Sequence, residues 1–114
     1  MSISIYIKEN SISTIEKWVN SIFENVISVD KDDDIYIFHG KYENEKISIT
    51  VTLNVSEQYG YSCLYFVFSG VSKWPTDEKC AREAYDYFGK KVVCSTKTID
   101  QNPYLWLHLS ENGE

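Results

Sequence analysis

The sequence contains few residues that could perform chemistry. Its 114 residues include only two histidines, His39 and His108, and three cysteines, Cys63, Cys80 and Cys94. The cysteines are 17 and 14 residues apart, whereas zinc sites use pairs two to four residues apart. Neither glycine-rich phosphate-binding pattern, GxGxxG or GxxxxGK[ST], occurs. Because nothing predicts that a histidine meets a cysteine as base and nucleophile, we expect a non-enzymatic protein without a cofactor or metal.

Long apolar runs and basic residues are also scarce. No run approaches the roughly 18 apolar residues of a membrane span, and the first apolar stretch, Ile3–Ile7, is too short for a signal peptide. We therefore expect a cytoplasmic protein without a leader or a membrane partner. There are 11 Lys and Arg against 17 Asp and Glu, a net charge of −6. This balance disfavours nucleic acid, which is itself polyanionic, and favours a basic protein partner.

The apolar content is sufficient for a folded core. Hydrophobic residues make up 43% of the chain and aromatic residues 15%, so we expect one domain over residues 1–114. The nine Tyr and three Trp exceed what a small core needs, and these residue types are enriched at binding surfaces. In the cytoplasm the three cysteines are expected to be reduced and packed in apolar surroundings, although the sequence leaves a Cys80–Cys94 bridge open.

Periodicity predicts an α+β fold, a two-layer sandwich of a mostly antiparallel sheet and two helices in the order β-α-β-β-β-α-β-β. A possible capping box over 13–16 opens the first helix, and Thr76 and Gly89 cap the second. We read 28–34 as an acidic turn and 39–45 as a hairpin connection, with Gly40 and Asn44 able to take positive φ. The strand over 61–69 is apolar on both faces and is therefore expected at the centre of the sheet. The predicted helices are about 12–26 and 77–88, and the predicted strands are 2–7, 35–38, 46–55, 61–69, 92–94 and 104–109.

Two helices on one layer would leave the other face of the sheet partly open. The residues opposite the aliphatic rows would then line it, subject to strand registers that the sequence does not fix. The expected lining residues are Tyr6, Tyr36, Phe38, Thr50, Thr52, Tyr104, Trp106 and His108.

The acidity is concentrated in the first half of the chain. Residues 1–60 hold ten acidic and five basic residues, and residues 61–114 hold seven and six. The densest acidic segment spans 30–34, but an EF-hand reading fails because its sixth and twelfth positions are Ile35 and Lys41 rather than Gly and Glu. Two interpretations remain open for this segment: a solvated loop, or a contact patch for a cationic partner.

Several aromatic residues are predicted in loops. Trp74 is either a buried lid over the core or an interface anchor, and the Tyr59–Tyr61 segment raises the same alternatives. Tyr42, between charged neighbours, is expected to be less buried. The partner-binding candidates are Asp30, Asp32, Asp33, Asp34, Tyr42, Glu43, Glu45, Tyr59, Tyr61 and Trp74.

The chain resembles the small cytosolic immunity proteins encoded beside bacterial polymorphic toxins, including those of contact-dependent growth inhibition systems. The resemblance covers its size, acidity and α+β layout. Locally it lies in Trp74-Pro-Thr-Asp-Glu78, Phe88, Val92-Val-Cys94 and Asn102-Pro-Tyr-Leu-Trp-Leu107. It implies inhibition of one cognate toxin domain, often a basic nuclease, but carries over no binding residues because such surfaces vary.

The alternative class is the small acidic secretion chaperones, which are similar in charge and size. They usually begin and end with helices and dimerise through one of them. Here strands are expected at both ends, and we expect the free chain to be a monomer.

Overall fold

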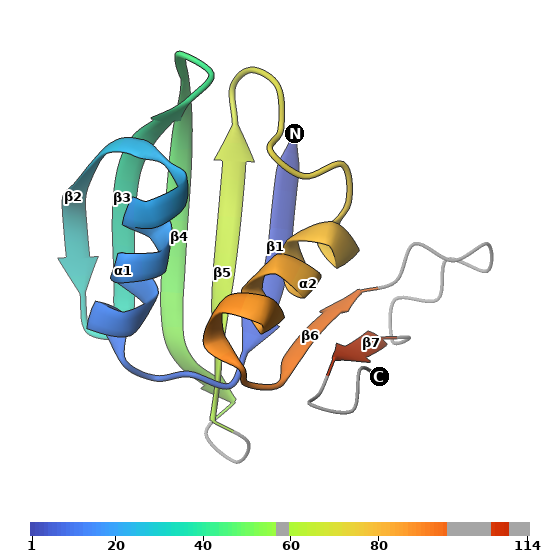
Figure 1. Ribbon diagram of the computed structural model, residues 1–114. Helices are drawn as coiled ribbons and strands as arrows, with labels where there is room; N and C mark the ends of the chain where they lie inside the picture. The colour runs from blue at the N-terminus through green and yellow to red at the C-terminus, as the bar shows by residue number, and fades with distance from the viewer. Residues whose placement is uncertain (57–59, 96–105, 110–114) are drawn as a thin grey trace.

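The protein folds as helices packed on one face of a seven-stranded antiparallel sheet with the strand order β2-β3-β4-β5-β1-β6-β7 (Figure 1). The computed structural model describes residues 1–56 and 60–95 and the strand at 106–109. The predicted α+β architecture is confirmed, and β5 lies at the centre of the sheet as expected. The elements are β1 Ser2–Ile7, α1 Ile12–Ile22, β2 Glu24–Asp32, β3 Ile35–Tyr42, β4 Glu45–Ser56, β5 Tyr61–Phe68, α2 Asp77–Phe88, β6 Val92–Ser95 and β7 Trp106–Leu109.

Strand β2 is the main departure from the predicted order. The helix expected to reach residue 26 ends at Ile22, because Phe23 turns to extended backbone with φ −126° and ψ 157°. The segment expected to be an acidic turn is then mostly strand, since it forms a hairpin with β3. Only Asp33 and Asp34 remain as the connection between the two strands. The predicted end of the helix was wrong because the apolar spacing of α1 continues to Val26, whereas the chain pairs with β3 from Glu24 onward.

The ends of the helices are set by local polar contacts. The oxygen of Ser11, rather than the expected Ser13, caps α1 by accepting from the backbone N–H of Thr14. For α2 the prediction is confirmed: Thr76 accepts from the N–H of Lys79, and Gly89 ends the helix in the left-handed region at φ 65°. Glycine adopts this conformation without the strain that a Cβ atom would cause. In the described part of the chain, neither helix is long and apolar enough to cross a membrane.

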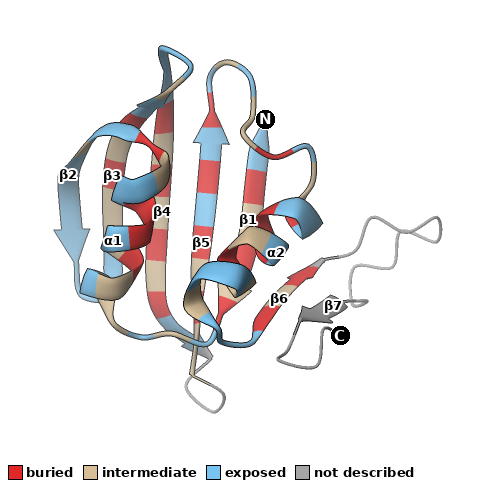
Figure 2. Ribbon diagram, in the orientation of Figure 1, coloured by how far each residue is buried: buried red, intermediate tan, exposed pale blue. Residues whose placement is uncertain are grey.

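The core lies between the helices and the sheet. Buried and exposed residues alternate along the central strands (Figure 2), as expected for a sheet covered on one face. Aliphatic rows from β1, β4 and β5 meet an aromatic cluster in which Trp18 stacks on Trp74, 6.1 Å between ring centroids. Phe66 packs edge-on against both indoles. Each large side chain buried in this way contributes about 1.5–3 kcal/mol to the free energy of folding.

The strand registers correct part of the predicted open face. Phe38 pairs with Ile49 and Tyr36 with Val51, so both belong to the helix-covered face with the core. Tyr6, Thr50 and Thr52 occupy the other face as expected, because they alternate with buried aliphatic residues. Tyr104 lies outside the described residues, as do the side chains of Trp106 and His108 in β7.

The connection between β3 and β4 is tighter than expected. It consists of Glu43 and Asn44, both at positive φ, 53° and 66°, which suits a two-residue hairpin. The prediction for Asn44 is therefore confirmed, but Gly40 is part of β3 rather than of the turn. A Cβ atom on Gly40 would come within 3.1 Å of both the Glu24 carbonyl oxygen and Val26 Cγ2, so this glycine lets β2 approach β3 closely.

A candidate protein-binding surface

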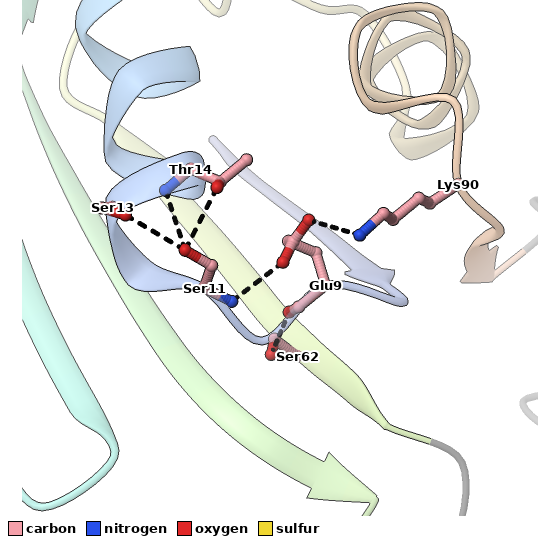
Figure 3. Close-up of polar contacts among 6 residues, drawn as sticks. All are labelled: Glu9, Ser11, Ser13, Thr14, Ser62 and Lys90. Carbon is pink, nitrogen blue, oxygen red and sulfur yellow. Dashed lines mark hydrogen bonds and ion pairs between the residues drawn. The ribbon is translucent and has the colours of Figure 1, made fainter.

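Some of the acidic side chains hold the fold together. Glu9 lies in the loop between β1 and α1, where one carboxylate oxygen accepts from Lys90 Nζ and the other from the Ser11 N–H, both at 2.9 Å (Figure 3). Its backbone carbonyl accepts from the Ser62 hydroxyl at 2.7 Å. Partial burial raises the pKa of Glu9, but the hydrogen bonds from Lys90 and Ser11 outweigh it, so this pKa lies below its usual value. Glu9 thus ties three segments that are distant in the sequence.

Two carboxylates of α2 have similar structural roles. Asp77 is buried, and its Oδ1 accepts from the Ser4 N–H of β1 at 3.2 Å. Glu83 accepts from Trp74 Nε1 at 3.0 Å and lies 3.8 Å from Lys73 Nζ. Both carboxylates accept hydrogen bonds from N–H groups of the fold. They stabilise it because a buried N–H left without an acceptor costs free energy.

A second group of acids, here called the acidic corner, comprises Asp30, Asp32, Asp33 and Asp34 at the hairpin between β2 and β3. All four are exposed. Within the described residues, none forms a side-chain hydrogen bond or ion pair with another element; Asp30 Oδ1 accepts only from the N–H of the adjacent Lys31. Lys31 lies between these carboxylates and offsets part of their charge, but the hairpin keeps a net negative charge, as a contact patch for cations would.

Apolar side chains lie beside these carboxylates. Ile27 is 59% exposed, Val29 is 42% exposed and Ile35 is 41% exposed. They belong to β2 and the start of β3, and β2 is an edge strand of the sheet. The combination of charged and apolar surface is typical of protein–protein interfaces, where a polar rim surrounds a less charged centre.

The other two predicted acids do not belong to this patch. Glu43 and Glu45 are exposed at the β3–β4 turn, at the opposite end of β3 from the acidic corner (Figure 1). Eight residues of strand separate the two turns, which corresponds to about 25 Å at the usual rise of about 3.3 Å per residue. The predicted partner-binding acids therefore lie on two separate surfaces.

The predicted aromatic anchors also separate. Trp74 is only 3% exposed within the aromatic core, so it is the lid rather than the anchor. Tyr42 is half-buried and packs edge-on against Phe23 and Phe68, which is more burial than its charged neighbours suggested. Tyr61 is half-buried, and this burial raises its pKa. Tyr59 lies outside the described residues.

The face of the sheet opposite the helices is the feature that the sequence predicted only in part. No described element covers it, and Tyr65 and Val67 of β5 are 42% and 39% exposed on it. These two residues were not among the predicted binding candidates; the strand over 61–69 was predicted only to be apolar on both faces and central in the sheet. Tyr65 and Val67 alternate with the buried Leu64 and Phe66. All four are apolar or aromatic, so the sequence alone does not show which face of the strand is exposed; the position of the helices decides it.

The thiols of the described residues are poor nucleophiles. All three cysteines are free, and Cys80 and Cys94 are buried. Burial raises the pKa of Cys80 well above its usual value and that of Cys94 to about 11. Burial also raises the pKa of Cys63, which lies near the Ser4 hydroxyl. Their thiolate forms are therefore scarce at neutral pH.

In the described part of the chain, no group of three or more His, Cys, Asp or Glu side chains could hold a metal ion. Comparisons of the chain with protein-family models, curated proteins and solved structures found no match.

Proposed function

We propose that this protein is an immunity protein that binds a basic bacterial toxin domain, such as a nuclease, and neutralises it. The observation that carries the proposal is the acidic corner: four exposed carboxylates on one hairpin, unpaired within the described fold and flanked by exposed aliphatic side chains. An enzyme that acts on a polyanion needs a cationic cleft, and this corner is complementary to such a cleft.

The physical role of the corner is to speed and orient the encounter. Like charges this close repel one another, so the corner is unfavourable for the isolated fold and becomes favourable beside cations. Acids at the rim of an interface act mainly on the association rate and on its salt dependence. Blocking the toxin's own substrate-binding cleft would then be sufficient for neutralisation.

The direct test is binding to the toxin domain encoded next to this gene, measured by surface plasmon resonance at low and high salt. The triple variant Asp32→Asn/Asp33→Asn/Asp34→Asn removes charge while keeping a residue that tolerates the φ of 52° at Asp33. We expect its association rate at low salt to fall about tenfold, and the difference to shrink at high salt.

The matched control is Glu43→Gln/Glu45→Gln, which removes charge at the other end of β3. It should lower the association rate by less than about threefold, because it removes fewer charges than the triple variant and leaves the acidic corner intact. Absence of binding to any neighbouring toxin, or binding that does not depend on salt, would contradict the proposal. An obligate dimer that captures a secreted effector instead would favour the chaperone class.

A further inference from the structure

We infer that the uncovered face of the sheet is the centre of the contact with the basic partner, with the acidic corner at its rim. The inference rests on the proposed function and extends it, because it places the desolvated part of the interface on residues that the acidic hairpin alone does not include.

The registers arrange this face in three rows that cross the strands from β3 toward β1. The first row runs through Ile35, Thr52, Cys63 and Tyr6, the second through Ile37, Thr50, Tyr65 and Ser4, and the third through His39, Ser48, Val67 and Ser2. None of these is Lys, Arg, Asp or Glu, although such residues make up 25% of the chain. Depletion of charged residues at the centre is typical of a protein–protein interface.

Charge appears where the rows end. On β2, Asp32 pairs with Ile35 and Asp30 with Ile37, so two carboxylates of the acidic corner extend the first and second rows. Beyond the third row, Lys41 pairs with Lys46 on the same face, beside a hollow of about 240 Å³ that both lysines and His39 help to line. Glu24 pairs with Lys41 in the register, and Glu43 and Glu45 lie at the same end of β3, so this end carries both signs of charge.

This distribution favours a basic partner in one orientation. Its cations are attracted to the rim at Asp30 and Asp32. They gain less at the opposite rim, where Lys41 and Lys46 offset the nearby acids, so the difference between the two rims favours one orientation. A second copy of the chain is disfavoured as the occupant, because each copy has a net charge of −6 and such charge keeps proteins apart.

The experiment measures the affinity of the neighbouring toxin domain for Tyr65→Glu, which places a charge at the middle of the central row. We expect its dissociation constant to rise at least about 100-fold, as for a hot-spot residue. The matched control is Val71→Glu, an exposed aliphatic position at 62% that lies in the loop after β5, off the sheet; it should stay within about threefold. Tyr65→Thr, which suits a strand, should give an intermediate loss.

A second measurement needs no substitution on the face. Cys63 is the only half-exposed thiol among the three, and it lies in the first row. At mildly alkaline pH, where more of its thiolate is present, we expect excess toxin domain to slow its labelling by a maleimide at least about tenfold, as burial in the centre of an interface would. The Lys41→Glu/Lys46→Glu variant should associate a few-fold faster at low salt, since it replaces two cations of this rim by acids.

The outcomes separate this inference from the proposed function. If the toxin domain binds and the acidic corner matters, but Tyr65→Glu and Cys63 labelling are unaffected, the inference is wrong while the proposed function stands. If no toxin domain binds the unmodified protein, both are wrong. If the free protein is a dimer by light scattering and Tyr65→Glu makes it a monomer, the face belongs to a second copy and the inference is overturned. Circular dichroism checks that each variant is folded.

Discussion

The carboxylates beside α2 and those at the β2–β3 hairpin have the same chemistry but different surroundings. Near α2, the side chains of Glu9, Asp77 and Glu83 accept hydrogen bonds from groups that would otherwise lack partners. At the acidic corner, Asp33 and Asp34 extend into solvent without such a partner among the described residues. The first group stabilises the fold, and the second adds repulsion to it.

This difference separates stability from binding along the sheet. A fold can keep unpaired like charges together only if the rest of the molecule supplies enough stability, and such local costs tend to coincide with functional surfaces. We therefore expect substitutions on the α2 side to change the free energy of unfolding and substitutions at the acidic corner to change association. Substitutions in each of the two groups test that separation.

The largest effect is expected for Trp74→Ala. The substitution empties the centre of the aromatic core, where Trp74 contacts Trp18 and Phe66, and it leaves Glu83 without the indole N–H. Large-to-small changes of buried aromatic residues cost about 3–5 kcal/mol, which is a large share of the stability of a small domain. Urea denaturation measures the change in the free energy of unfolding, and a loss below about 1 kcal/mol would show that Trp74 is not a core residue.

Asp77→Ala should have the next largest effect. It removes the acceptor of the Ser4 N–H, and a buried donor left unpaired costs about 1–3 kcal/mol. Asp34→Ala is the control from the acidic corner, where a surface substitution should stay within about 0.5 kcal/mol. Equal losses for the two variants by chemical denaturation would remove the distinction between the two groups of acids.

The pH dependence of Glu9 gives a smaller effect on the same side of the molecule. Because its pKa is lower in the folded state than in the unfolded state, Glu9 stabilises the fold above its unfolded pKa, and this contribution is lost as the pH falls through its folded pKa. The contribution of Glu9 to the free energy of unfolding should be below about 1 kcal/mol, because Lys90, the partner of Glu9, is half exposed.

Glu9→Gln tests this contribution directly. Between neutral and acidic pH, the variant should lose less stability than the unmodified protein, since glutamine does not titrate over this range. Parallel stability curves for the two proteins, measured by urea denaturation at several pH values, would show that the contacts of Glu9 do not depend on its charge.

The sequence was sufficient for the class of fold because its signals were local. Alternation over 46–55 and the caps at Thr76 and Gly89 each depend on neighbouring residues, and the structure confirms them. It was not sufficient for β2, whose strand state comes from pairing with β3 and whose register is broken by two irregularities. A strand that buries little of its own surface has no clear periodic pattern to detect.

For the candidate surface, individual residues could be predicted from the sequence, but their arrangement on the fold could not. The density of acids at 30–34 is visible in the sequence and led to the acidic corner. The separation of Glu43 and Glu45 from it depends on the length of β3, which ran four residues further than its apolar pattern, to Tyr42. The central position of Tyr65 depends on which face of the sheet the helices cover, and that is a tertiary choice that no single strand encodes.

The smallest expected effect is a gain of stability at the acidic corner itself. Asp32→Asn/Asp34→Asn halves the number of like charges in the corner without touching a partner in the described fold. The reduced repulsion should raise the melting temperature by no more than about 2 °C at low salt, and the gain should vanish at high salt because the charges are exposed and screened. Differential scanning calorimetry at two salt concentrations measures this shift. If the melting temperature fell instead, these carboxylates would be structural like those beside α2, and the surface proposed for the partner would lose its electrostatic basis.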